Sequence, residues 1–193
     1  MHARTLPVPG GRQQGFSLIE VLVSMFIVSL GILALSGLMQ ASSRYGKTSE
    51  LRSTATLLAN DIADHIRVNA LAAHAFGAPP GYNLQDPYTS SPALTPPTPA
   101  ACVTFAECNA DQLAAVDLYA FQTRLKAMLP GGDAYMAYRP PLAKSNARGA
   151  VDVWVAWTDP TPGKNERPKT ECATEMNVDD NTAVRCIYLQ VGL

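Results

Sequence analysis

Glu20 is the one charged residue in an otherwise uncharged, largely apolar run from Phe16 to Met39. As a helix, this run of about 24 residues would be roughly 36 Å long, enough to span a bilayer core of about 30 Å. An ionised carboxylate inside that core costs on the order of 2.5–3.5 kcal/mol even on the lenient insertion scale. Glu20 therefore needs either a hydrated position near the headgroups or a cationic partner that compensates its charge.

Four cysteines follow the apolar run: Cys102, Cys108, Cys172 and Cys186. They lack Cys-x-x-Cys spacing and none of the three histidines lies near them, so a zinc site is not expected. An even number of cysteines in an exported domain is typical of disulfides formed in an oxidising compartment. Three connectivities are possible. We favour the local pairs, Cys102–Cys108 and Cys172–Cys186, because each closes a loop rich in turn and polar residues.

The remaining polar residues give little support for catalysis. No histidine follows His74, so a Ser-His-Asp or Cys-His arrangement would have to use His65 or His74. Asp61 and His65 have a spacing that can chelate a metal, but no third ligand is visible and a solvated helix face is the better interpretation. The net charge of −1 does not indicate a nucleic-acid surface. We expect no catalytic residue, cofactor, metal or nucleic-acid partner; a membrane-anchored extracytoplasmic enzyme is the less favoured alternative.

One long helix should carry the apolar run into the rest of the chain. No proline interrupts residues 16–78, and we expect the helix to continue to about Ala75. Gly77-Ala78-Pro79-Pro80-Gly81 should end it. The following proline-rich segment is interpreted as a loop draped over the domain, with a disordered linker as the alternative. An apolar stripe with spacings of three and four residues predicts that the second half packs on a domain: Leu51, Ala55, Leu58, Ile62 and Ile66.

The rest of the chain predicts a second helix and a small antiparallel sheet. Asn109 and Gln112 can form a capping box, and Pro130-Gly131-Gly132 should end the helix that follows. Its expected buried face is Ala114, Leu118, Phe121, Leu125 and Met128. Strands are expected at residues 134–138, 151–157 and 184–191. Residues 159–182 are interpreted as a surface loop, and both tryptophans, Trp154 and Trp157, as core or sheet-packing residues.

The stretch from Gly15 to Val21 contains the six-position motif G-F-[ST]-L-[IL]-E without a departure, and the chain here resembles the leader of a type IV prepilin. Only His2, Arg4 and Arg12 carry basic side chains in the first fifteen residues, and no acid is present. The resemblance implies that prepilin peptidase cuts after Gly15 and methylates the amine of Phe16. It also implies that Glu20 registers subunits in a filament by pairing with a neighbour's Phe16 amine.

This resemblance divides the chain into four parts. Residues 1–15 would be the leader peptide, 16–39 the transmembrane and filament-core helix, 40–76 its amphipathic continuation, and 77–193 a periplasmic or extracellular domain. The expected fold is a pilin-like α+β arrangement, in which one long N-terminal helix packs on a small antiparallel sheet. The resemblance implies an inner-membrane protein, with its domain in the periplasm, that later joins a cell-surface pilus.

Downstream features resemble PilV-type minor pilins: a short Cys…Cys loop, a helix ending at Leu129-Pro130-Gly131-Gly132, a valine-rich strand with tryptophan, and a late cysteine pair. Such a subunit helps to initiate pilus assembly near the filament tip. Its partners would be other minor pilins, the major pilin, prepilin peptidase and the inner-membrane assembly machinery. A pseudopilin of a type II secretion system, such as the GspI type, is the alternative, although those subunits are usually shorter and lack this cysteine framework. A major pilin is less favoured, because Gly37 stands where many major pilins carry proline.

Overall fold

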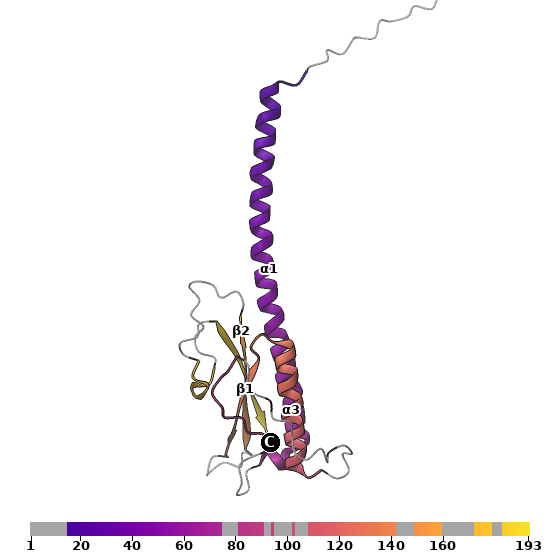
Figure 1. Ribbon diagram of the computed structural model, residues 1–193, viewed down its shortest axis with the longest axis vertical. Helices are drawn as coiled ribbons and strands as arrows, with labels where there is room; N and C mark the ends of the chain where they lie inside the picture. Colours follow the sequence, from indigo (N-terminus) through magenta and orange to yellow (C-terminus); the bar gives the residue numbers. More distant parts are fainter. Residues whose placement is uncertain are drawn as a thin grey trace, which may run out of the picture. The chain divides into compact units, whose positions relative to one another are not determined.

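Helix α1, Leu18–Val68, is the longest element of the chain and has 51 residues. In the computed structural model the chain divides into two units, Met1–Arg44 and Tyr45–Leu193, and α1 contributes residues to both. The elements are shown along the chain in Figure 1. The structure describes residues 15–74, 81–90, 94, 102, 108–141, 149–159, 172–178 and 183–193.

The second half of α1 supplies one wall of the core of the second unit. Its buried stripe repeats every three or four residues, as an amphipathic helix requires. Ala55, Ile62 and Ile66 have no exposed surface at all. The predicted stripe is therefore confirmed, and two alanines on the same face, Ala59 and Ala63, are buried beside it.

The predicted unbroken helix to about Ala75 is wrong, because α1 ends at Val68 and a short helix, α2 (Ala70–Ala73), follows. Asn69 separates them with φ −107° and ψ 46°. Its side-chain Nδ2 donates to the Ala110 carbonyl at 2.8 Å, a residue 41 positions away. A tertiary hydrogen bond of this kind leaves no local pattern in the sequence.

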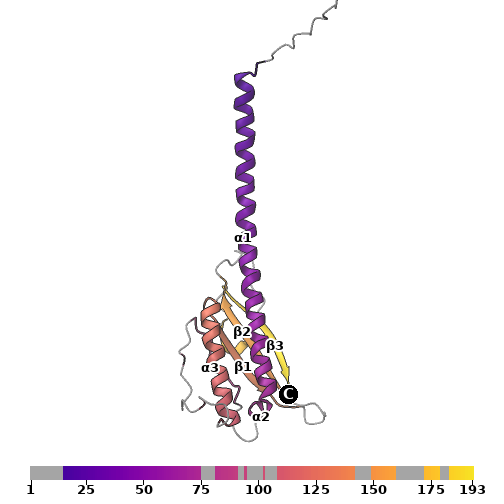
Figure 2. The same ribbon diagram turned by 90° about the vertical axis from the view of Figure 1, so that its right-hand side faces the viewer.

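Helix α3, Ala110–Met128, runs alongside the C-terminal half of α1 (Figures 1 and 2). The predicted capping box is present: Gln112 N–H donates to Asn109 Oδ1 at 2.8 Å, and Asn109 N–H donates to Gln112 Oε1 at 3.0 Å. Met128 was expected on the buried face but is 54% exposed. The chain leaves helical geometry at Leu129, which is extended and takes the buried position instead.

Three strands form an antiparallel sheet in the order β1-β2-β3, as expected for this fold class. They are β1 (Asp133–Arg139), β2 (Ala150–Thr158) and β3 (Val184–Gly192). Figure 2 shows the sheet beside α1 and α3. Alternate residues of β2 face the helices and have at most 2% exposure: Val151, Val153, Val155 and Trp157. The pilin-like α+β arrangement is therefore confirmed.

The opposite face of the sheet carries a second, smaller core. Tyr135, Ala156 and Cys186 are buried there. The segment 172–178, which contains the 3₁₀ helix η2 (Thr174–Met176), covers them with Met176 and its neighbours. This part of the predicted surface loop thus has a packing role; residues 160–171 and 179–182 lie outside the described residues.

The described part of the predicted loop after α2, residues 81–90, packs on the domain through aromatic and apolar side chains. Tyr82 is fully buried, and Leu84 forms a β-bridge with Met136 on the outer side of β1. The Tyr88 hydroxyl donates to the Gly131 carbonyl at 2.9 Å. Gly131 has φ 59°, and a Cβ there would lie 2.7 Å from the Thr158 hydroxyl, so this turn requires glycine.

Candidate functional site

The N-terminal end of α1 holds the residues that the sequence analysis singled out. Gly15 and Phe16 precede the helix, and the Ser17 carbonyl accepts from the backbone N–H of Glu20 at 3.0 Å and of Val21 at 3.3 Å. These bonds close the first turn and place Glu20 within it. His2, Arg4 and Arg12 lie outside the described residues.

The position of Glu20 is electrostatically favourable for an acid. The first turn of a helix carries partial positive charge from N–H groups without intrahelical partners, so a carboxylate there is stabilised by about 0.3–1 kcal/mol. The side chain is exposed, and no ion pair of Glu20 occurs in the described part of the chain. Glu20 is thus free to meet a cation from outside its own chain.

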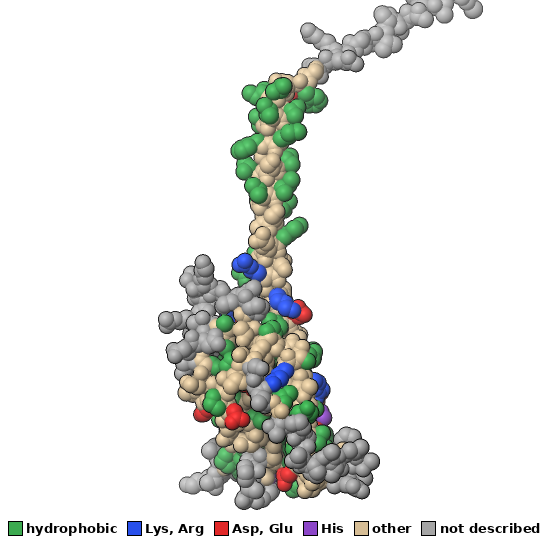
Figure 3. Space-filling view, in the orientation of Figure 1, with side chains coloured by type: hydrophobic (Ala, Val, Ile, Leu, Met, Phe, Trp, Pro, Cys, Tyr) green, Lys and Arg blue, Asp and Glu red, His purple; other side chains and the backbone are tan. Residues whose placement is uncertain are grey.

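The helix that follows Glu20 exposes apolar side chains on every side. Among its large hydrophobic residues, exposure runs from 42% at Val21 to 72% at Met39. Figure 3 shows these hydrophobic side chains along the first part of α1. The segment is long and apolar enough to cross a membrane, and none of it is buried in its own chain. Such a surface is unfavourable in water, and lipid or the helices of other proteins would shield it.

Small polar residues of this segment are compatible with such surroundings. The hydroxyl groups of Ser24, Ser29 and Ser36 donate to backbone carbonyls three or four residues earlier, at 2.8, 2.7 and 2.9 Å. The serines therefore need no water to satisfy their donors. Gly31 and Gly37 have open space where a Cβ would stand, so another helix can approach closely there.

In the second unit, four polar residues join α1, α3 and the loop between them. The Tyr82 hydroxyl donates to Asp117 Oδ2 at 2.5 Å, and His65 Nδ1 lies 3.0 Å from Asp117 Oδ1. Asn69 Nδ2 reaches the Tyr82 hydroxyl at 3.3 Å. Burial, reinforced by the Asp117 carboxylate, raises the pKa of Tyr82 far above its ordinary value. The neutral phenol is the form that the network needs as a donor.

This network was not predicted, and it gives a structural meaning to His65. His65 and Asp61 do not share a ligand: Asp61 Oδ2 pairs with Arg124 at 2.8 Å, whereas His65 contacts Asp117. Both contacts tie α1 to α3. The residues come from positions as far as 63 apart in the sequence, so local spacing alone could not reveal them.

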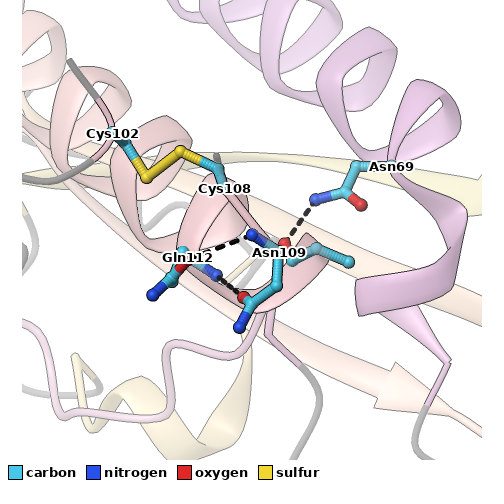
Figure 4. The surroundings of a disulfide bond; sticks show 6 residues. Asn69, Cys102, Cys108, Asn109 and Gln112 are labelled. Atoms are coloured by element: carbon cyan, nitrogen blue, oxygen red, sulfur yellow. Dashed lines mark hydrogen bonds between the residues drawn. A yellow bond between two sulfur atoms is a disulfide. The ribbon is translucent and has the colours of Figure 1, made fainter. Parts of the chain in front are cut away.

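Both local disulfides favoured by the sequence analysis are present. Cys102–Cys108 has its Cα atoms 5.5 Å apart and lies directly before the cap of α3 (Figure 4). Figure 4 also shows Asn69 reaching the backbone beside Asn109, so this end of α3 is held by a covalent bond, a capping box and a hydrogen bond from the residue that follows α1.

Cys172–Cys186 joins the segment around η2 to β3, with Cα atoms 5.1 Å apart. Cys186 is buried in the smaller core. The bridge holds the covering segment against the outer face of the sheet. No cysteine is free, and no group of three metal-ligating side chains occurs among the residues described.

Comparison with known proteins bears on the N-terminal segment. Residues 10–36 match the family model of the prokaryotic N-terminal methylation motif. No curated protein and no solved structure matches the chain. The match includes Gly15, Phe16 and Glu20 and covers the apolar run as far as Ser36.

The chain therefore carries the N-terminal methylation motif of the type IV pilin and pseudopilin superfamily, on a pilin-like α+β fold. The motif implies processing by prepilin peptidase and assembly with pilins. Together with the exposed apolar helix, it indicates anchoring in the inner membrane before assembly. Proteins with this motif are typically structural subunits rather than enzymes.

Proposed function

We propose that this protein is a minor pilin of the type IV pilus, of the PilV type, which helps to initiate assembly and lies near the filament tip. The observation that carries the proposal is the single acid, Glu20, in the first turn of an exposed apolar helix, five residues after Gly15 within the matched motif. A helix that merely anchors a domain in a membrane has no need of that charge.

Three residues have distinct roles in this proposal. Gly15 ends the leader, and cleavage after it frees the amine of Phe16, which is then methylated. Phe16 is 83% exposed and precedes the first residue of α1, so the bond after Gly15 is accessible to a membrane peptidase. Glu20 of one subunit compensates the Phe16 amine of another, which offsets the cost of holding both charges in an apolar filament core.

The same helix has two environments in turn. In the membrane, lipid covers its apolar side chains; in the filament, the helices of other pilins cover them. In both environments the hydroxyl groups of Ser24, Ser29 and Ser36 keep a partner, because they bond within the helix. The open space at Gly31 and Gly37 allows close helix packing in the filament.

Features of the second unit support a minor pilin over the alternatives. Two disulfides stabilise this unit: one lies at the start of α3, and the other joins the segment around η2 to β3. Pseudopilins of the GspI type are usually shorter and lack such a framework, and many major pilins carry proline where this chain has Gly37. Its partners would be other minor pilins, the major pilin and the inner-membrane assembly machinery.

Deletion of the gene from the native cells tests this proposal against the pseudopilin alternative. A minor pilin that initiates assembly predicts at least a tenfold fall in surface pili, with type II secretion unchanged and with rescue by the wild-type chain. Normal numbers of pili together with lost secretion would overturn the proposal in favour of a pseudopilin. Normal values of both would exclude an initiating role.

A further inference from the structure

The two edges of the sheet differ in how they are closed. At β1, the outer edge meets residues 81–90, where Leu84 N–H donates to the Met136 carbonyl at 3.1 Å and Met136 N–H donates to the Leu84 carbonyl at 2.7 Å. At β3, the other edge has no strand neighbour besides β2 within the described part of the chain. Among the residues that the structure describes, only the β1 edge of the sheet is thus covered by another segment.

The bonds to Leu84 establish which backbone groups of β1 point outward. Successive residues of an antiparallel strand direct their N–H and C=O groups to opposite sides. Because Met136 bonds outward, its neighbour Tyr135 bonds inward to β2, where the register places it opposite Trp154. Trp154 therefore directs its backbone groups toward β1.

The same alternation carries over to β3. Since Trp154 bonds toward β1, Val153 bonds toward β3, where its partner is Leu189. The bond from Leu193 N–H to the Gly149 carbonyl, 3.0 Å long, has the same phase. The even-numbered residues of β3 therefore direct their N–H and C=O groups to the free edge, and none of these groups has a hydrogen bond within the described residues: Cys186, Tyr188, Gln190 and Gly192.

A groove of about 660 Å³ lies along this edge. One wall is the surface of α1, with Arg52, Thr56 and Asn60; the other is β3, with residues 187–189. Trp154 and Cys172 complete the lining on the outer face of the sheet. All these residues belong to the second unit. The groove is therefore bounded by α1 on one side and by β3, with its outward N–H and C=O groups, on the other.

Side chains of the groove add apolar and charged recognition to these backbone groups. Tyr188 is 47% exposed, and its ring lies 4.8 Å from that of Trp154, which forms an aromatic surface beside the edge. Arg52 is exposed and has no ion pair among the residues described, unlike Arg67 and Arg124, which pair with aspartates. An occupant with an acidic side chain would compensate the Arg52 guanidinium.

We propose that this groove binds an extended segment of another filament subunit, which adds to β3 as a fourth antiparallel or parallel strand. An extended backbone has the spacing that satisfies alternate N–H and C=O groups along the edge from Cys186 to Gly192, about 20 Å at roughly 3.4 Å per residue. The segment places an apolar side chain against Trp154 and Tyr188 and an acidic one at Arg52. The choice of a filament subunit as partner rests on the proposed function; the strand-binding edge does not.

Photo-cross-linking in cells that express the full chain tests this site. A photoreactive phenylalanine analogue replaces Tyr188, and Gln190 is changed to proline or to alanine in parallel. Both changes remove the Gln190 side chain, but Gln190→Pro alone removes the outward N–H, and proline is tolerated on edge strands. We expect cross-links to one segment of a pilus subunit, at least fivefold weaker with Gln190→Pro, the effect of about one backbone hydrogen bond, and within twofold of the parent with Gln190→Ala.

Equal yields in the proline and alanine variants would overturn strand addition, as would cross-links to lipid or polysaccharide alone. A partner outside the filament would overturn the choice of partner. If Gln190→Pro loses its two disulfides or its folded state, Arg52→Glu replaces it, with Arg52→Lys as the control that keeps the charge. Arg52→Glu should weaken the cross-link and Arg52→Lys should not; equal yields would overturn the site. Recovery of the wild-type chain from sheared pili tests the proposed function independently of the cross-links.

Discussion

At the scale of single residues, Glu20 is the side chain whose charge is unfavourable in a membrane and therefore requires an explanation. Two interpretations of this side chain predict different behaviour. If Glu20 merely stays hydrated near the headgroups, replacing it should be harmless or should ease membrane insertion. If it compensates a neighbour's amine, the loss of its charge should leave a positive charge unpaired among packed helices.

Glu20→Gln separates these interpretations because it keeps the size of the side chain and removes the charge. We expect the variant to be inserted, cleaved after Gly15 and folded, but to fall at least tenfold in sheared pili relative to membranes. Glu50→Gln is the matched control, since Glu50 is an exposed acid on the same helix, paired only with Lys47. Normal incorporation of Glu20→Gln would show that helix shape alone recruits the subunit.

The Tyr82 hydroxyl is the buried donor in the network that joins α1 and α3. Tyr82→Phe keeps the ring but leaves the buried Asp117 carboxylate without its closest donor. We expect the free energy of unfolding to fall by about 1–3 kcal/mol, measured by denaturant titration of the purified chain in detergent. Tyr45→Phe, at a tyrosine 77% exposed, should change it by no more than about 0.5 kcal/mol. Similar values for the two variants would contradict the importance of the network.

At the scale of elements, the two disulfides should differ in their contribution. Cys172–Cys186 closes a loop with a sequence separation of 14, against 6 for Cys102–Cys108. A bridge over about 15 residues contributes roughly 3 kcal/mol in the chain-entropy model, and this one also holds the smaller core. Replacing both Cys172 and Cys186 by alanine should therefore lower the thermal midpoint more than the same change at Cys102 and Cys108. The reverse order would contradict the role of the η2 segment in covering the sheet.

The elements that the sequence predicted well are those with a strong local period. The stripe on α1, the capping box of α3 and the alternation of β2 each depend on residues a few positions apart. The break at Asn69, the bridge from Leu84 to Met136 and the packing of segment 172–178 depend on distant partners. The free edge of β3 could not be predicted either, because strand order and hydrogen-bond phase follow from tertiary pairing.

The candidate site divides in the same way. Gly15, Phe16 and Glu20 could be proposed as site residues from the sequence, because they lie within one short motif ahead of an apolar run. Arg52 belongs to a groove built from α1 and β3, and no spacing in the sequence relates it to Tyr188. The local motif therefore predicts how the chain is processed, whereas predicting its contacts with other proteins requires the folded domain.

At the scale of the whole molecule, the chain combines two units with different surfaces. The first exposes an apolar helix long enough to cross a membrane; the second has its own core and two disulfides. Such a division suits a protein that is stored in a membrane and then moved into a filament. We propose that the chain passes from the membrane into the filament after cleavage at Gly15.

The most direct test is the intact mass of the protein recovered from sheared pili. We predict a chain that begins at Phe16, carries one methyl group on its amine and retains both disulfides. Cells without prepilin peptidase should keep the full-length chain in the membrane, and the same result is expected for a bulky substitution at Gly15. A wild-type chain that keeps residues 1–15, or one that is cleaved but found only in the membrane while pili are abundant, would contradict the account.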